Sequence, residues 1–264
     1  MFRQNASLVL SILGLLFVVS PAVCFATATT HIWAPSTDVQ PYGVIHVTPG
    51  DIYVPVSKDS SGNRVDVITN EGLTVGVLPF DKFNVEVGFD NKTGYGELDN
   101  YPIYFNAKGG IPEGAFGEWF PALAIGAYDI GTKTDKTNND LLYFKGAKTF
   151  KIKDFNLGRL SMGYFNGNGK LLRGPNGGKD NAGVFGAWER TMTEISDKLW
   201  LCVEYQGTKS TYGSWNFGGS WKFSDNVSLL VGFDRYNNRN LADTVTVQVD
   251  IDFDAFSKLF KGKK

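Results

Sequence analysis

Apolar and polar residues alternate one by one along several short segments of this chain. In residues 244–253 (TVTVQVDIDF), valine, isoleucine and Phe253 occupy one face, and threonine, glutamine and aspartate occupy the other. A period of two places alternate side chains on opposite faces of a β-strand. The same period recurs in 83–90, 199–206, 215–223 and 227–234. The pattern therefore predicts an all-β protein whose strands each have an apolar and a polar face.

Extended along the chain, this pattern gives about twelve strands, and less regular fourth and sixth spans leave ten or fourteen open. The Pro49-Gly50 pair inside the first span predicts a β-bulge or a split into two strands, because proline cannot donate to a β-ladder. The expected spans are 42–57, 66–79, 83–91, 101–109, 117–131, 140–151, 154–166, 182–192, 198–207, 212–223, 227–237 and 243–253.

The connections between these spans alternate between short and long. Short turns are expected at 81–82, 151–154, 193–197 and 224–226. Longer polar loops are expected at 58–64, 91–100, 132–140, 167–181, 207–211 and 237–243. A soluble β-sandwich also has alternating strands, but short turns at one end and long loops at the other are typical of membrane barrels. We therefore predict a closed, up-and-down antiparallel transmembrane β-barrel over residues 42–253.

Aromatic residues gather at the ends of the predicted strands. One set lies near the short turns: Phe80, Phe83, Phe150, Phe155, Trp221, Phe223 and Phe253. A second set lies near the long loops: Tyr128, Tyr164, Tyr205, Tyr212, Phe233 and Tyr236. Transmembrane barrels carry aromatic girdles at both interfaces with water. The two sets are therefore expected to anchor the barrel in a membrane.

The first 26 residues are typical of a secretory signal peptide. A positive start at Arg3 is followed by an apolar run over 8–19, which is too short to span a bilayer, and then by small residues. Ala26 fits the last position before cleavage, with Ala28 as a second choice. Residues 27–41 then form an N-terminal lead-in. Export through a cleaved signal peptide predicts a location in the bacterial outer membrane.

Charge and cysteine content reduce the number of functions that the sequence suggests. Removing residues 1–26 takes away Arg3 and leaves 25 basic against 27 acidic residues, which gives no electrostatic reason to expect a nucleic acid partner. Only Cys202 then remains, and a single thiol without a neighbouring histidine favours a packing role. No cofactor is implied by this composition.

Catalytic and metal-binding signatures are absent from the sequence. The only histidines are His31 in the lead-in and His46 in the first strand, and no lipase, zinc-protease or paired-cysteine motif occurs. The loop 91–100 is rich in oxygen ligands but lacks the spacing of a calcium loop, which favours a solvated loop. The sequence therefore predicts a protein that is not an enzyme and binds no metal.

Five segments resemble bacterial outer-membrane β-barrel proteins, and more narrowly an uncharacterised set of small outer-membrane barrels. They are 31–43, 72–83, 101–110, 194–207 and 226–238. The resemblance implies the barrel fold, contact with outer-membrane lipid and recognition of the last strand by the barrel-assembly machinery. The resemblance implies no particular activity for this chain. The tail 254–264 departs from barrels that end on an aromatic residue, so either Phe253 or Phe260 is the recognised one. The tail fits an amphipathic basic helix or a frayed terminus.

The inward face of such a barrel sets its function. One reading is a porin or channel for passive diffusion of small solutes or ions through a narrow charged lumen. An alternative is a non-conducting structural or adhesion barrel that presents its loops to partners. In that case the lumen is blocked, and Arg159, Lys108 and Lys222 pair with carboxylates. An outer-membrane enzyme is the third hypothesis. Monomer and oligomer are both compatible with the sequence. The predicted pore-lining residues are Glu86, Asp90, Asn106, Lys108, Arg159, Glu189, Glu204, Lys222, Asp234, Gln248 and Asp250, with Asp252 on the same face.

Overall fold

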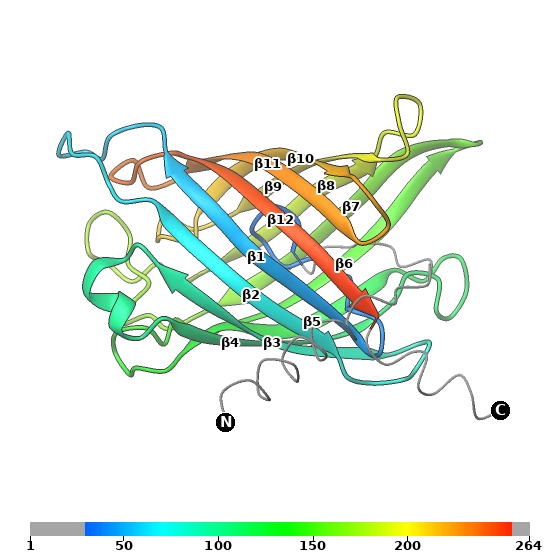
Figure 1. The fold of residues 1–264 in the computed structure, drawn as a ribbon, viewed down its shortest axis with the longest axis horizontal. Helices are drawn as coiled ribbons and strands as arrows, with labels where there is room; N and C mark the ends of the chain where they lie inside the picture. Colours follow the sequence, from blue (N-terminus) through cyan, green and yellow to red (C-terminus); the bar gives the residue numbers. More distant parts are fainter. Residues whose placement is uncertain (1–29, 255–264) are drawn as a thin grey trace, which may run out of the picture.

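The computed structural model describes residues 30–254, which form a closed barrel of twelve antiparallel strands (Figure 1). Each strand pairs with its neighbours in the chain, and β1 pairs with β12 to close the sheet. The predicted fold class and the count of twelve strands are confirmed. The strands are β1 (Val44–Pro55), β2 (Ile68–Gly76), β3 (Asn84–Thr93), β4 (Ile103–Ile111), β5 (Ala122–Gly131), β6 (Leu141–Ile152), β7 (Phe155–Asn166), β8 (Ala182–Thr191), β9 (Leu199–Gln206), β10 (Ser214–Lys222), β11 (Val227–Tyr236) and β12 (Thr244–Asp254).

Little else in this part of the chain is regular. A short 3-10 helix, η2 (Gly96–Asn100), lies between β3 and β4. Within residues 30–254, no helix is long and apolar enough to cross a membrane. The predicted signal peptide (1–26) and the predicted tail beyond Asp254 lie outside the described residues, so both stay predictions.

The first strand contains the expected irregularity. Its register shifts between Val47 and Gly50 against β12, and between Thr48 and Asp51 against β2. The strand nevertheless runs unbroken from Val44 to Pro55. The Pro49-Gly50 pair therefore makes a bulge and does not split the strand.

The start of β5 is the largest departure from the expected spans. It was predicted at residue 117 and lies at Ala122. Pro121 has no N–H to donate to the ladder, and Gly117 adopts a φ of 121°, outside the strand region. The connection 112–121 is consequently long although it lies on the short-turn side, so connection lengths alternate less strictly than predicted.

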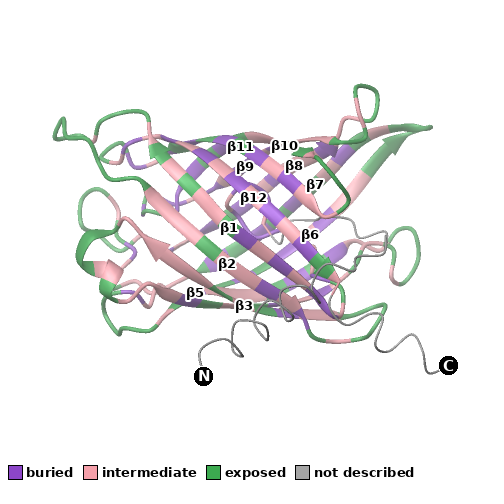
Figure 2. Cartoon of the chain, viewed as in Figure 1, coloured by how far each residue is buried: buried purple, intermediate pink, exposed green. Residues whose placement is uncertain are grey.

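The two faces of the barrel wall differ sharply in exposure (Figure 2). On β6, Leu142 and Phe144 are 63% and 60% exposed, whereas Tyr143 and Lys145 are 6% and 1% exposed. The outward side chains are apolar along most strands, and the inward ones include most of the buried charged residues. An apolar wall of this extent is stable where lipid covers it. The structure is thus a porin-like barrel in its architecture.

The predicted aromatic girdle is correct at one end of the barrel and wrong in part at the other. All seven aromatics near the short turns are exposed. Near the long loops, Tyr212 and Tyr236 are buried, and their rings lie 5.7 and 5.8 Å from the ring of Trp33 inside the barrel. Tyr128 packs against Tyr212 at 6.1 Å. These three tyrosines therefore do not belong to a girdle, because their rings lie inside the lumen, where they pack with Trp33 and with one another.

The difference between the two faces predicts how charge is tolerated on the outer wall. Val231 lies midway along β11, and Val227 lies on the same face at the end of that strand, beside a turn. We expect Val231→Arg to lower the free energy of unfolding by about 2–4 kcal/mol and Val227→Arg by about 0–1 kcal/mol, because the cost of a lipid-facing charge depends on depth. Urea unfolding in lipid vesicles measures both values. Equal losses at the two positions would contradict a membrane-embedded wall.

Candidate functional site

Residues 30–40 lie inside the barrel, where the blue chain passes behind the strands in Figure 1. We call them the luminal segment. Its tip is a reverse turn, closed by a hydrogen bond from His31 N to Ala34 O (2.9 Å) and by a bridge between Thr30 and Pro35. His31, Ile32 and Ala34 are each at most 1% exposed. Residues 30–40 of the predicted lead-in are therefore part of the barrel interior.

Glu204 on β9 is the main anchor of this turn. Its carboxylate accepts hydrogen bonds from the backbone N–H groups of Ile32 (3.2 Å), Trp33 (2.8 Å) and Ala34 (3.0 Å). The amide of Asn216 on β10 donates a fourth bond at 2.5 Å. Successive backbone N–H groups that converge on one anion form a nest, which here binds a carboxylate of the same chain. These donors offset the cost of burying the charge of Glu204.

The carbonyl oxygens of the turn are held from other strands. Lys145 on β6 donates to Pro35 O (2.8 Å) and lies 3.1 Å from His31 Nδ1. Gln248 on β12 donates to Ile32 O at 2.8 Å. An imidazole that accepts from the Lys145 ammonium at Nδ1 carries its proton on Nε2, which lies 3.3 Å from Glu189 on β8. Acidic, basic and amide side chains of four strands therefore fix one peptide turn.

The rest of the luminal segment is fixed by side chains of β7 and β3. Arg159 on β7 donates to both oxygens of Asp38 (2.8 and 2.9 Å) and lies 3.5 Å from Glu189. Glu86 on β3 accepts from the backbone N–H of Gln40 at 2.7 Å. Glu86 also pairs with Lys108 at 3.2 Å. The segment is thus tied to the wall from its tip to its end.

Glu113, in the connection 112–121, reaches the same end of the barrel. Burial acts to raise its pKa, but hydrogen bonds from the backbone and hydroxyl of Thr149, together with Lys148, outweigh this effect and lower the pKa. The ionised carboxylate also lies 3.7 Å from Arg159 Nε. Glu113 therefore places a further negative charge beside Arg159, the residue that binds Asp38.

Ten of the eleven predicted pore-lining residues lie in the lumen, and nine of these, all except Asp234, contact the luminal segment, one another or a cavity. Lys222 has an inward position in the ladder, opposite Ser228, but lies at the end of β10 and pairs with Asp225 of the following turn at 3.5 Å. Whether the ten border a conducting path stays a prediction. The ten are Glu86, Asp90, Asn106, Lys108, Arg159, Glu189, Glu204, Asp234, Gln248 and Asp250.

Sequence reasoning missed several charged residues of the lumen. Lys145 is buried at 1% exposure, but its neighbours on β6 are apolar on both faces, so the alternation cannot be read there. Lys92 on β3 forms an ion pair with Asp129 on β5 at the inner face of the barrel wall. Tyr212 donates a hydrogen bond to the same Asp129 carboxylate. Asp129 belongs to the irregular end of β5, where the register against β4 shifts. A bulge of this kind is invisible to a period-two pattern.

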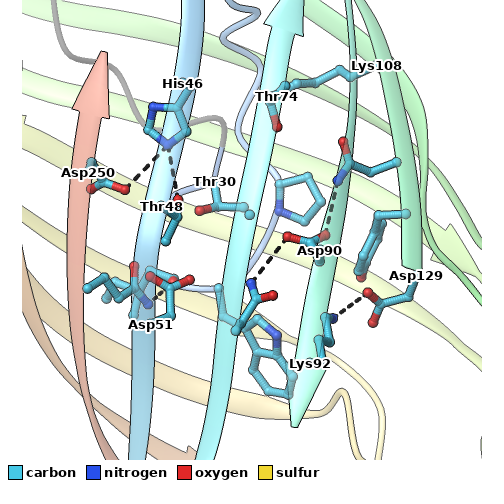
Figure 3. Close-up of a pocket in the computed structure, with 18 of the residues that line it drawn as sticks. Thr30, His46, Thr48, Asp51, Thr74, Asp90, Lys92, Lys108, Asp129 and Asp250 are labelled. Atoms are coloured by element: carbon cyan, nitrogen blue, oxygen red, sulfur yellow. Dashed lines mark hydrogen bonds and ion pairs between the residues drawn. The ribbon is translucent and has the colours of Figure 1, made fainter. Parts of the chain in front are cut away.

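A cavity of about 140 Å³ remains between the luminal segment and the wall formed by β1 to β5 (Figure 3). Trp33 and Ile32 of the segment border it on one side. The ionisable residues that line the strand side are five acidic residues, Asp51, Glu86, Asp90, Asp129 and Asp250, and three basic ones, His46, Lys92 and Lys108. The luminal segment therefore fills the side of the lumen next to β6–β8. The side next to β1–β5 is partly empty, and its acidic groups outnumber its basic ones.

His46 borders this cavity in an arrangement that resembles a nucleophile triad. Its Nδ1 lies 2.8 Å from Asp252 Oδ1, and its Nε2 lies 3.3 Å from Thr48 Oγ1. However, Asp250 Oδ1 also lies 3.4 Å from Nε2, as Figure 3 shows. Carboxylates at both ring nitrogens favour the doubly protonated ring, which cannot accept a proton from Thr48. The geometry does not support His46 as a general base.

In the described part of the chain, no three histidine, cysteine, aspartate or glutamate side chains are placed to hold a metal ion. The loop 91–100 is instead organised by hydrogen bonds to Asp99 from the backbone N–H groups of Gly94 and Tyr95.

Comparison with known proteins shows that the chain is similar to some of them in fold alone. No protein-family model and no curated protein matches the chain. Among solved structures, an outer membrane channel from Pseudomonas putida F1 is 11% identical, with 83% of this chain and 98% of that chain covered and a TM-score of 0.49. The NanC porin is 10% identical, with 79% and 98% covered and a TM-score of 0.48. A mutant porin of Rhodopseudomonas blastica is 11% identical, with 80% and 74% covered and a TM-score of 0.40. At these values the likeness supports no conclusion about what enters the barrel.

Proposed function

We propose that this protein is a narrow channel of the bacterial outer membrane, through which small solutes or ions diffuse passively, with the luminal segment as its constriction. The observation that carries the proposal is the polar cavity of about 140 Å³ between that segment and the strands β1 to β5. A barrel interior that served only as a packed core would need no such space lined by charged groups.

The two sides of the lumen have different roles in this proposal. On the side of β6 to β8, Leu141, Phe165 and Phe185 form a buried apolar cluster with Ala34 of the luminal segment. This cluster closes that side to water. On the side of β1 to β5, the lining carries charged and polar side chains beside apolar ones, and the space is incompletely filled. Solutes are expected to pass along this second side, between Trp33 and the strands.

The charge of the lining favours cations. Five carboxylates and three basic groups border the cavity, and carboxylate-lined constrictions favour cations over anions. Glu86 and Lys108 neutralise each other at 3.2 Å, as do Lys92 and Asp129. The remaining acidic groups therefore set the sign of the field.

A second candidate function is a non-conducting structural or adhesion barrel. It is favoured by the density of contacts that hold the luminal segment, including the pairing of Arg159 with Asp38. In that case the connections 132–140 and 167–181 would carry the contacts to partners. The two candidates differ in whether current crosses the refolded barrel.

The first experiment is single-channel recording of the refolded mature protein in a planar bilayer. We expect stepwise currents with a preference for cations. Glu86→Gln should reduce that preference, because it removes a carboxylate from the lining and with it the negative charge of the Glu86–Lys108 ion pair. The matched control is Glu71→Gln, which makes the same charge change on the outward face of β2.

The result that would overturn the channel proposal is a refolded barrel that carries no current. Heat-modifiable migration on a gel verifies that the barrel has folded in that case. Such an outcome would support the non-conducting barrel and direct attention to its loops.

The native thiol tests whether the luminal segment can leave its place. Cys202 is 2% exposed and packs beneath Ile32 of the turn. Glu204→Gln removes the charge that accepts three backbone N–H groups, and the loss of a hydrogen bond to a charged group costs about 1.5–3 kcal/mol. Since 1.4 kcal/mol corresponds to a factor of ten, we expect Cys202 to react with a small water-soluble thiol reagent about 10 to 100 times faster in this variant.

Glu71→Gln again serves as the matched control and should label at the wild-type rate. The reading is simple because Cys202 is the only cysteine that follows the predicted signal peptide. Unchanged labelling in Glu204→Gln would contradict the role of Glu204 as the anchor of the turn.

A further inference from the structure

Two carboxylates in the cavity have no basic partner. Asp51 on β1 and Asp90 on β3 both line it, and no described lysine, arginine or histidine nitrogen lies within 4.0 Å of either carboxylate. The three basic side chains of the cavity are engaged elsewhere. Lys92 pairs with Asp129, Lys108 pairs with Glu86, and His46 lies between Asp250 and Asp252.

Asp51 and Asp90 lie on either side of β2, the strand that carries Asn70. Asn70 is directly opposite Asp51 in the ladder, and its amide donates to Asp90 Oδ1 at 3.3 Å. Asn106 on β4 donates to the other oxygen of Asp90 at 3.0 Å. Both amides therefore direct a donor at Asp90. Asp51 Oδ1 and Asn70 Oδ1 are buried and accept no hydrogen bond from any described residue.

The backbone around this cluster leaves space for the carboxylates. A Cβ atom at Gly72, which is opposite Asp90 in the ladder, would lie 2.8 Å from Asp90 Oδ1. Any larger residue at position 72 would therefore displace the carboxylate. The neighbouring lining includes the ring of Tyr53 on β1 and the ring of Trp33 on the luminal segment.

An anionic cluster of this kind is incomplete on physical grounds. A buried carboxylate needs a counter-charge or hydrogen-bond donors, and a buried acceptor without a donor costs free energy. Here the acceptors outnumber the donors, while a cavity lies beside them. The missing partner is therefore a small group that is positively charged and donates several hydrogen bonds.

We propose that Asp51, Asn70 and Asp90 form a subsite for the primary ammonium group of a small organic solute. A –NH₃⁺ group has three N–H donors and no acceptor, which matches the unfilled oxygens. A metal ion is a poorer match, because no three histidine, cysteine, aspartate or glutamate side chains within residues 30–254 are placed to hold one. The aromatic rings of Tyr53 and Trp33 suit the organic part and a nearby cation.

This inference rests on the proposed function, because it names the class of solute that the channel would conduct. The test uses the refolded mature protein in detergent and ethylammonium chloride as the probe, with binding measured by calorimetric titration. We expect ethylammonium to bind the wild type, and Asp51→Asn and Asp90→Asn each to weaken binding at least tenfold. Asp154→Asn, at the exposed turn between β6 and β7, is the matched control and should bind as the wild type does.

The variants are expected to fold, because each replaces a buried carboxylate that has no basic group within 4.0 Å by a neutral amide of nearly the same shape. A second measurement needs no variant: ethylammonium should raise the urea midpoint of the wild type in proportion to its occupancy. Absence of ethylammonium binding would overturn the inference, as would binding that Asp51→Asn and Asp90→Asn leave intact. Equal binding of tetramethylammonium, which has no N–H donor, would also overturn it.

The outcomes for the two proposals are separable. Conductance in potassium chloride without ethylammonium binding would leave the channel standing and remove the ammonium subsite. Ethylammonium binding to a barrel without conductance would leave the subsite standing and remove the channel.

Discussion

Closure of the sheet is the constraint on which the rest of this structure depends. Lipid offers no hydrogen-bond partners, so a sheet that spans it must pair every backbone group, and the pairing of β1 with β12 removes the last free edge. Closure fixes an inside and an outside for every strand. It also fixes the width of the interior, which twelve strands make too wide for their own side chains to fill.

The luminal segment fills part of this wide interior. It brings an apolar cluster to β6–β8 and presents backbone N–H groups to Glu204, so most of the buried charge finds a partner. On β3 the segment donates the backbone N–H of Gln40 to Glu86, a carboxylate that also pairs with Lys108. The excess of carboxylates on the side of β1–β5 is the electrostatic feature that distinguishes this lumen from a uniformly paired interior.

The barrel itself was predictable from the sequence, because alternation, turn residues and strand length all act locally. The spans agree closely, and even the bulge at Pro49-Gly50 follows from the chemistry of proline. The luminal segment was not predictable, because HIWAPSTDVQ has no period of its own and its partners are set by distant strands. One signal was available: the alternation places Tyr236 on the same inward face as Asp234, which argues against a girdle. The pairings of Lys145 and Asp129 depend on three-dimensional contacts that periodicity does not encode.

The contacts of the turn have a consequence for the order in which the molecule assembles. Ile32 and Ala34 bond to a residue that follows them by 172 and 170 positions, and the bond from Gln248 to Ile32 spans 216. Contacts of such sequence separation form late, since a long loop must close before they contribute. A segment that precedes β1 in the chain therefore finds its place only after β9 and β12 exist. The start of the described chain is among the last parts of the protein to become ordered.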